Sequence, residues 1–529
     1  MKYIFRHLSL VLIVVALVAG CQPKTSSSFE LQGKLEGITD GKAILTEIGG
    51  DEQKADTILI KNGEFKYKRT LEGPVQVYLT VVDKDYPAYF YAENLPMTLT
   101  GHADTLYQAV ITGGTINADE KRFNQGTSEI YKKFKLDSLY KVMQDNRNDA
   151  TQAQIDAESE KYTAETDLYQ LDFIKKNPAS YYSAVLVSRI SFGLGAEEIE
   201  KNLAMLDPKL SKYPIIDEIR ENIEILKSTD VKIETFANDA ADTEFALDKA
   251  YPGENHKDMV YLATFPDDRL CALRKDGLVC VIGTDGKQIS AFKTNLTARP
   301  TALAIDQSNG RLFVLGTLIQ EKTNKFRGKE YKSEEKVGVE CLVYDSKGTE
   351  LKKLPLTGLK TATGAKVLNG KLLISDFSSR KVGIFNAETG TMESSVNDLR
   401  ACCGILDFGV NNKQEILVAN LGAFRVQAFD YTGKIKYAFG RRGLGLNDFH
   451  GCCNPVNVAF LTNGAIITVE KDPTRIKVYT KSGAKKVEGI QELVKGCAYI
   501  PMVCDSKNNL YLASANSGIV KCSPQPALK

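Results

Sequence analysis

Two pairs of adjacent cysteines are the residues of this sequence with the clearest capacity for chemistry. They occur in Ala401-Cys-Cys-Gly404 and in Gly451-Cys-Cys-Asn454, so the pairs lie about 50 residues apart. A fifth cysteine, Cys497, precedes Pro501 much as the second pair precedes Pro455. Thiols can form disulfides, exchange disulfides with another protein, or bind a soft metal ion.

Three interpretations of these cysteines are compatible with the sequence. Structural disulfides, within a pair or between neighbouring strands, would stiffen the loops that carry them. A redox site would alternate between dithiol and disulfide. A site for Cu(I) or Zn²⁺ would use thiolates with His450 as a further ligand, although adjacent cysteines seldom both bind one tetrahedral ion. No specific cofactor is implied, and the candidate site comprises Cys402, Cys403, Cys452, Cys453 and Cys497.

The N-terminus predicts export and lipidation. Lys2 and Arg6 precede an apolar run, Leu8 to Ala19, that is too short for a comfortable membrane span. The run ends in Val18-Ala19-Gly20-Cys21, which resembles the lipobox of bacterial lipoproteins. The resemblance implies a signal peptide over residues 1–20 and a tether over residues 21–28, held in the lipid bilayer by acyl chains on Cys21.

The net charge indicates which class of partner to expect, and the residue after the lipidated cysteine indicates which membrane holds the protein. The 68 basic and 66 acidic residues become equal in number once Lys2 and Arg6 are cleaved off. A net charge near zero argues against a nucleic-acid partner. Gln22 in place of an acidic residue favours the outer membrane, facing the periplasm or displayed at the cell surface. In such an oxidising compartment disulfides are permitted.

Residues 29–114 and 115–230 have different periodicities. The first stretch alternates with period two and predicts a small β-sandwich, in which Asn62-Gly63 would join strands near Thr57–Ile60 and Phe65–Tyr67 as a hairpin. The second stretch predicts amphipathic helices, whose first apolar stripe is Phe123, Ile130, Phe134 and Tyr140.

These two segments together resemble the front half of certain lipoprotein thiol–disulfide oxidoreductases of Gram-negative gut bacteria. In that family an uncharacterised β-domain and a helical segment precede a thioredoxin domain with Cys-x-x-Cys. No Cys-x-x-Cys occurs in this chain, so the family's redox chemistry does not carry over. The matching residues are Gly33, Gly37, Gly41, Asp56-Thr57, Asn62-Gly63-Glu64-Phe65 and Asn177-Pro-Ala-Ser180.

A repeat dominates residues 231–527. Six copies of short apolar strands, separated by glycine turns, recur about 40 to 60 residues apart. Such units cannot bury both faces alone, so we expect them to form a six-bladed β-propeller. The last copy is one strand short, and we expect residues near 231–250 to supply that strand. The lysine- and glutamate-rich stretch from Leu318 to Glu340 is interpreted as a projecting loop.

The copies after residue 400 resemble NHL repeats, which serve mostly as binding scaffolds. The resemblance implies that the paired cysteines lie where consecutive blades begin their innermost strands, at one mouth of the central channel. The matching residues are Phe439-Gly440, Gly443, Gly445, Phe449, Pro455, Val418-Ala419-Asn420 and Arg425–Phe429.

Other polar residues and cysteines of the propeller are weaker candidates. Asp407, Asn457 and Asp505 follow the inner-strand starts and could line the channel. Arg441 and Arg442 form a small basic spot that suits either a solvated linker or an anionic partner. Cysteines within strand patterns are expected to be buried as small apolar residues; these are Cys271, Cys280, Cys341 and Cys504.

The sequence therefore predicts a mainly β, multidomain envelope lipoprotein. The function that the sequence favours is that of a non-enzymatic propeller scaffold, which binds an envelope protein, a peptide or a small ligand. The alternative is an enzyme or electron-transfer component that works through the paired cysteines, either as a thiol-redox centre or with a soft metal.

Overall fold

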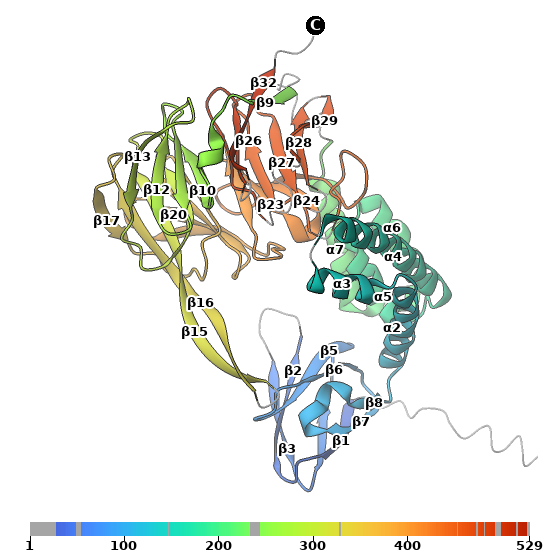
Figure 1. Ribbon diagram of the computed structural model, residues 1–529. Helices are drawn as coiled ribbons and strands as arrows, with labels where there is room; N and C mark the ends of the chain where they lie inside the picture. The colour runs from blue at the N-terminus through green and yellow to red at the C-terminus, as the bar shows by residue number, and fades with distance from the viewer. Residues whose placement is uncertain are drawn as a thin grey trace, which may run out of the picture. The chain divides into compact units, whose positions relative to one another are not determined.

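The computed structural model describes residues 28–48, 54–146, 148–232, 244–326, 329–451, 453–471, 474–480, 482–491, 499–514 and 517–525 (Figure 1). The chain divides into two compact units. The first extends to Ser188 and adds Lys201–Glu218 and Lys325–Lys329. The second comprises Arg189–Glu200, Ile219–Asn324 and the chain from Glu330 onward. The predicted signal peptide and Cys21 lie outside the described residues.

Two sheets with a shared core form the N-terminal β domain, which confirms the predicted sandwich. Every second side chain of β1 (Phe29–Glu36) is buried, as expected for a strand with one face on a core. The strand orders are β4-β1-β7-β8 and β3-β2-β5-β6, and both sheets contribute to one apolar cluster. The other strands are β2 (Gly41–Glu47), β3 (Ala55–Ile60), β4 (Glu64–Arg69), β5 (Val75–Val81), β6 (Ala88–Ala92), β7 (Pro96–His102) and β8 (Val110–Thr112).

The Asn62-Gly63 turn forms, but the predicted hairpin pairing is wrong. Both residues have positive φ, 52° and 74°, as a tight turn of this kind requires. However, β3 pairs with β2 and β4 pairs with β1, while Lys61 and Glu64 form an isolated bridge across the turn. The turn carries the chain from one sheet to the other, because each strand finds a longer partner there.

Aromatic contacts organise the helical segment. The ring of Phe123 stacks on Tyr169 with centroids 5.4 Å apart and lies edge-on to Tyr182 at 5.7 Å. Phe123 and Ile130 are buried as predicted, but Tyr140 is 46% exposed because the left-handed residue Lys135 ends one helix and redirects the next. The helices are η1 (Ala103–Gln108), α2 (Thr115–Lys133), α3 (Leu136–Asp145), α4 (Asp149–Lys176), α5 (Tyr181–Ser191), α6 (Ala196–Leu203), η2 (Pro208–Lys212) and α7 (Pro214–Thr229). None of the described helices is long and apolar enough to cross a bilayer.

Six four-stranded sheets occupy the described part of the C-terminal region. The first strand of each sheet contacts the first strands of its two neighbours, so the inner strands close a ring and the predicted propeller is confirmed. Blade 1 contains β10 (Met259–Thr264), β11 (Leu270–Arg274), β12 (Leu278–Ile282) and β13 (Gln288–Lys293); blade 2 contains β14 (Arg299–Ile305), β15 (Leu312–Phe326), β16 (Lys329–Tyr344) and β17 (Glu350–Leu354); blade 3 contains β18 (Gly364–Leu368), β19 (Lys371–Asp376), β20 (Lys381–Asn386) and β21 (Met392–Val396).

The remaining blades include the one that joins the two ends of the repeat array. Blade 4 contains β22 (Asp407–Val410), β23 (Ile416–Asn420), β24 (Arg425–Phe429) and β25 (Ile435–Phe439); blade 5 contains β26 (Asn457–Phe460), β27 (Ile466–Glu470), β28 (Arg475–Thr480) and β29 (Gly483–Lys486); blade 6 contains β30 (Met502–Cys504), β31 (Leu510–Ser514), β32 (Gly518–Gln525) and β9 (Glu244–Leu247). Short turns of helix occur at η3 (Gly253–Asn255) and η4 (Leu421–Ala423).

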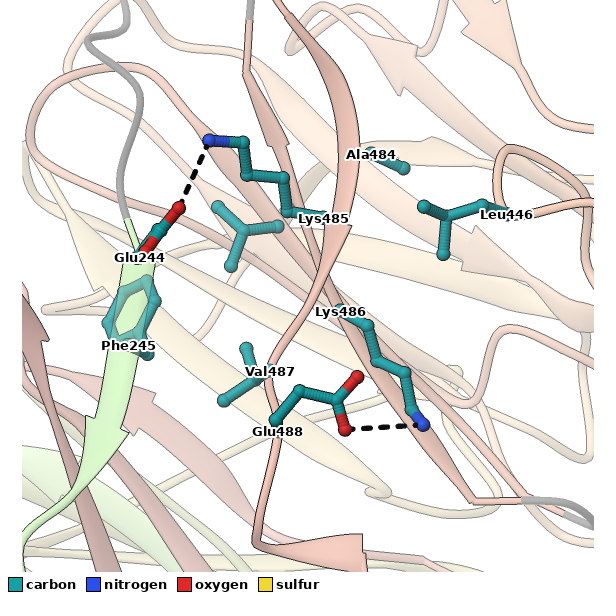
Figure 2. A pocket seen from close by; sticks show the side chains of 9 residues that line it. Glu244, Phe245, Leu446, Ala484, Lys485, Lys486, Val487 and Glu488 are labelled. Atoms are coloured by element: carbon teal, nitrogen blue, oxygen red, sulfur yellow. Dashed lines mark ion pairs between the residues drawn. The ribbon is translucent and has the colours of Figure 1, made fainter. Parts of the chain in front are cut away.

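Strand β9 closes the ring, as the missing strand of the last repeat predicted. It pairs antiparallel with β32, with Leu247 opposite Cys522 and Glu244 opposite Gln525. Because β9 precedes the first blade in sequence and β32 ends the last, this pairing joins the two ends of the array. A shallow pocket of about 530 Å³ lies where β9 meets β29, and ion pairs between Lys485 and Glu244 and between Lys486 and Glu488 occupy its wall (Figure 2).

The described residues of the stretch from Leu318 to Glu340 lie in two strands rather than in a loop. Strands β15 and β16 have 15 and 16 residues, far more than their blade neighbours. Opposite charges face each other along them, including Lys332 with Glu321 at 2.8 Å. Alternating lysines and glutamates therefore support cross-strand pairing here, where their charge alone suggested a solvated loop.

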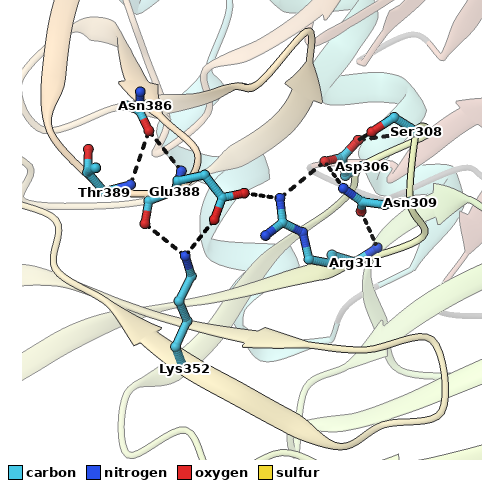
Figure 3. Close-up of polar contacts among 8 residues, drawn as sticks. All are labelled: Asp306, Ser308, Asn309, Arg311, Lys352, Asn386, Glu388 and Thr389. Carbon is cyan, nitrogen blue, oxygen red and sulfur yellow. Dashed lines mark hydrogen bonds and ion pairs between the residues drawn. The ribbon is translucent and has the colours of Figure 1, made fainter.

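Turns on the outer edges of the blades use asparagine and aspartate side chains as hydrogen-bond acceptors. In the turn after β20, Asn386 accepts the N–H groups of Glu388 and Thr389 (Figure 3). The Glu388 carboxylate then binds Arg311, which belongs to blade 2, and Lys352 Nζ at 2.9 Å. A turn of the repeat, stabilised by its asparagine side chain, therefore also connects neighbouring blades through Glu388.

The buried contacts of Glu340 allow a test of how much the connection between blades contributes to the free energy of unfolding. Its carboxylate is 4% exposed and accepts from Thr297 N (2.7 Å), Thr297 Oγ1 (2.9 Å), Ala298 N (3.0 Å) and Lys353 Nζ (2.8 Å). Burial raises its pKa, but these donors outweigh burial and hold the pKa at about 2.

We expect Glu340→Gln to lower the free energy of unfolding by about 2 to 4 kcal/mol, because a buried acceptor loses its charge. A depressed pKa contributes stability above the unfolded value near pH 4.3 and loses it as pH falls toward 2. The difference between wild type and variant in urea titrations should therefore be constant from pH 7 to 5 and shrink below pH 4.5. Glu334→Gln, whose ion pair with Arg299 is exposed, should cost at most about 1 kcal/mol. Equal losses in the two variants would contradict this account.

Candidate functional site: a thiol cluster on the propeller

Three cysteine sulfurs from two consecutive blade connections meet in the second unit. Cys402 and Cys403 lie between β21 and β22, and Cys453 lies between β25 and β26. Cys402 Sγ is 3.4 Å from Cys403 Sγ and 2.8 Å from Cys453 Sγ, and all three sulfurs lie within 4.8 Å of one another. These three residues are called the thiol cluster. None of them forms a disulfide in the structure.

A tight turn presents the first two thiols. Cys403 and Gly404 both have positive φ, 55° and 76°, and the N–H of Ile405 donates to the Cys402 carbonyl at 3.0 Å. Ile405 is 5% exposed and anchors the turn in the apolar core. Because the turn reverses the chain in so few residues, the two adjacent side chains can both reach Cys453.

The Asn454 side chain holds the loop that carries the third thiol. Asn454 is fully buried, and its Oδ1 accepts the N–H of Lys471 at 2.8 Å. Its Nδ2 donates to the carbonyls of Lys471, at 2.8 Å, and of His450. One amide thus fixes both ends of the loop to the end of β27, which places Cys453 against Cys402.

Exposure and charge differ across the thiol cluster. Cys403 is exposed, Cys402 is half-buried and Cys453 is 6% exposed. Burial raises the pKa of Cys403, but hydrogen bonds with Cys402 and Lys471 and the positive charge of Lys471 outweigh burial and lower its pKa below the ordinary thiol value. The thiolate, which is the form that binds metals and attacks disulfides, is therefore favoured at the exposed end.

The other predicted site residues lie apart from this cluster or outside the described residues. Cys452 and Cys497, like Cys21, are outside them. His450 is in the same loop, and its N–H donates to Glu470 Oε2 at 2.9 Å, but its ring is not among the ligand atoms that lie within 4.8 Å of one another.

Arg441 and Arg442 bind the connection from α5 to α6 instead of the thiols. Arg441 forms ion pairs with Asp448 at 3.1 Å and with Glu198 at 3.6 Å. The N–H of Arg442 donates to the carbonyl of Gly193 at 2.8 Å. Both arginines thus join residues 193–198 to the linker after blade 4, within the second unit.

The cysteines predicted within strands are in strands. Cys271, Cys280 and Cys341 are buried in β11, β12 and β16. Cys504 is half-buried in β30, and burial raises its pKa to about 12. A thiol with so high a pKa is protonated at neutral pH and unreactive.

Two of the three predicted channel residues lie within the ring of inner strands. Asp407 begins β22 and Asn457 begins β26, and Asn457 Nδ2 donates to Asp407 Oδ2 at 3.1 Å. Asp505 lies instead in the turn after β30, where it accepts the N–H of Asn509 at 2.8 Å. Tyr261 and Lys366, which join Asp407, were not predicted from the sequence; the signal was a lone lysine in the otherwise apolar strand Gly364–Leu368.

Comparison with known proteins identifies the type of the N-terminal domain. Residues 29–120 match the family model described as "Domain of unknown function (DUF4369)", so the N-terminal β domain is of this type. No curated protein matches the sequence.

Three β-propeller structures illustrate the likeness of the C-terminal region. Streptogramin B lyase matches 53% of this chain and 98% of its own at 11% identity, with a TM-score of 0.37. Catalytically inactive virginiamycin B lyase from Staphylococcus aureus with quinupristin matches 53% and 99% at 11% identity, with a TM-score of 0.36. The Pan2 WD40 domain of Neurospora crassa matches 55% and 96% at 12% identity, with a TM-score of 0.35. Likeness at this level concerns the fold alone.

The role of Asn454 can be tested by the accessibility of Cys453. Loss of its three buried hydrogen bonds should ease opening of the loop by about 2 kcal/mol, which increases the alkylation rate of Cys453 by roughly tenfold or more in Asn454→Ala. Iodoacetamide labelling of the native protein, followed by mass spectrometry, measures this rate. Asn411→Ala removes a comparable acceptor from a turn of blade 4 and should leave the rate unchanged. Equal rates in the two variants would show that Asn454 does not hold the loop.

Proposed function

We propose that this chain is a lipid-anchored binding protein of the cell envelope whose propeller holds a soft metal ion at the thiol cluster. The observation that carries the proposal is the convergence of three sulfurs within 4.8 Å from two separate connections. A disulfide or a simple redox pair needs two thiols. Three convergent thiols from buried and exposed positions match the donor set of a soft ion.

The donor set favours a soft monovalent ion such as Cu(I). Thiolates select Cu(I) and Zn²⁺ among biological metals. Structural Zn²⁺ sites almost always have four ligands, whereas three thiols converge among the described residues. The positive charge of Lys471 also offsets part of the negative charge of three thiolates around a monovalent ion. The ion would be cargo, which agrees with a scaffold that performs no reaction.

Thiol–disulfide exchange is the second candidate, and two features favour it. Cys402 and Cys453 have their sulfurs only 2.8 Å apart, and Cys403 combines exposure with a lowered pKa. The Cys403 thiolate would attack a disulfide of a partner protein and release one partner thiolate. A second thiolate of the cluster would then attack Cys403 Sγ and release the other, so that the partner's disulfide is reduced as the cluster is oxidised.

The location and partner of the protein belong to the same proposal. Acylation of Cys21 would anchor the chain in a bilayer, and Gln22 favours the outer membrane over the inner one. An envelope protein or peptide that delivers or receives the ion is the expected partner, reached by the exposed Cys403. A balanced net charge supports a partner other than nucleic acid.

Metal binding can be tested with the protein purified under reducing conditions. We expect one equivalent of Cu(I) to bind in competition with a Cu(I)-specific chelator. Cys402→Ser should weaken binding by at least roughly 100-fold, because Cys402 is the sulfur in contact with both others. Cys504→Ser, which removes a thiol outside the cluster, should bind as the wild type does.

Failure of the wild type to compete for Cu(I) would contradict the metal proposal. If the reduced protein then formed a disulfide within the thiol cluster while reducing a small disulfide reagent, the second candidate would replace it. Peptide mapping after alkylation identifies that bond.

Lipidation can be tested separately in the producing cell. An alkyne-bearing fatty acid should label the wild type and Cys504→Ser but not Cys21→Ser, since only the thiol at position 21 accepts the lipid. Labelling is read by in-gel fluorescence after click coupling. Equal labelling of Cys21→Ser and Cys504→Ser would exclude Cys21 as the anchor.

A further inference from the structure

Polar side chains from five blades meet inside the ring of inner strands, distinct from the thiol cluster. The five described residues, called the channel cluster, are Tyr261 of β10, Lys366 of β18, Asp407 of β22, Asn457 of β26 and Tyr499 before β30. Their blades are not all neighbours, so side chains must reach across the ring to make these contacts.

Two tyrosines span the ring in this way. The Tyr261 hydroxyl accepts the N–H of Ala365 at 3.2 Å, which connects blade 1 to blade 3. The Tyr499 hydroxyl donates to Asp407 Oδ1 at 3.4 Å, which connects blade 6 to blade 4. A Cβ atom at Gly364 would lie 3.2 Å from the Tyr261 hydroxyl and 3.4 Å from Asp407 Oδ1. The two contacts therefore occur at one place in the channel.

The Asp407 carboxylate is fully engaged by protein donors. It is 5% exposed and accepts from Asn457 Nδ2 at 3.1 Å, from Val458 N at 3.3 Å and from the Tyr499 hydroxyl. Asp407 thus connects blades 4, 5 and 6. Its oxygen atoms have little capacity left to accept hydrogen bonds from a ligand.

Two groups beside Asp407 keep unused hydrogen-bonding capacity. Asn457 is fully buried, and its Oδ1 receives no hydrogen bond from the described residues. Lys366 has its Nζ 5.2 Å from the centroid of the Tyr261 ring and shares a hydrogen bond with the Tyr261 side chain, while the charge of Asp407 acts on it through space. As a whole residue, Lys366 is half-buried. The channel therefore holds an unmatched acceptor and a cation with unused N–H donors, both beside Asp407.

The ammonium of Lys366 keeps its charge in this setting. Burial lowers its pKa, but the neighbouring Tyr261 and Asp407 outweigh burial and raise the pKa above the ordinary lysine value. An ammonium that its neighbours hold in the charged form, with N–H donors left unused, attracts an anion.

We propose that the channel cluster binds a small carboxylate that carries a hydroxyl or amino group on the neighbouring carbon. The carboxylate binds the Lys366 ammonium, and the hydroxyl or amino group donates to Asn457 Oδ1. The ligand is small because Tyr261 and Tyr499 cross the ring beside it. No thiol takes part, so this site is independent of metal binding at the thiol cluster.

Glycolate, the smallest hydroxy acid, is the probe, and acetate is its matched control without the hydroxyl. Titrated into the full-length protein and followed by saturation-transfer NMR, glycolate should bind about tenfold more tightly than acetate, the effect of one hydrogen bond to a buried acceptor. Lys366→Met should lose glycolate binding by at least about tenfold. Lys371→Met, which removes a surface lysine paired with Glu393, should bind as the wild type does.

Three results would overturn the proposal. They are no binding of glycolate to the wild type up to about 50 mM, equal affinity for glycolate and acetate, and unchanged glycolate affinity in Lys366→Met. If circular dichroism shows that Lys366→Met does not fold, Lys366→Gln replaces it and is judged by the same criterion. The comparison of glycolate with acetate in the wild type decides the role of Asn457 in either case.

Discussion

Closure of the ring by β9 against β32 is the constraint on which the rest of the propeller depends. Each four-stranded blade has two apolar faces that only its neighbours can bury, so the array is stable when every blade has two neighbours. Packing of consecutive blades within this ring also decides chemistry, because it brings the connections that enter successive inner strands to one place. Cys402 and Cys453 are 51 residues apart in sequence, yet their sulfurs are 2.8 Å apart.

Both candidate sites use the same two strand entrances. Strand β22 begins a few residues after Cys403, and strand β26 begins a few residues after Cys453. The first residues of these strands, Asp407 and Asn457, contact each other inside the ring. A closed ring thus supplies thiols on its entering loops and polar groups on its inner strands. Buried amides position both sets, Asn454 for the thiols and Asn457 for the channel.

Periodic features of the fold were predictable from the sequence, and contacts between distant residues were not. The repeats specified the six blades and the missing strand, and their common register placed the cysteine pairs at equivalent points. The pairing of β3 with β2, and the Lys–Glu ribbon of β15 and β16, depend on competition between partners that local patterns do not encode. Lys366 was missed because one lysine in an apolar strand has no motif; only the ring gives it Asp407 and Tyr261 as neighbours.

Convergence of the three thiols on one soft ion is the central claim, and X-ray absorption at the copper edge tests it most directly. After loading with one equivalent of Cu(I), the nearest shell of the metal should contain three sulfur atoms and no nitrogen or oxygen. Cys402→Ser should show fewer sulfurs at the same loading. A nearest shell of nitrogen or oxygen, or a spectrum unchanged in Cys402→Ser, would contradict the account.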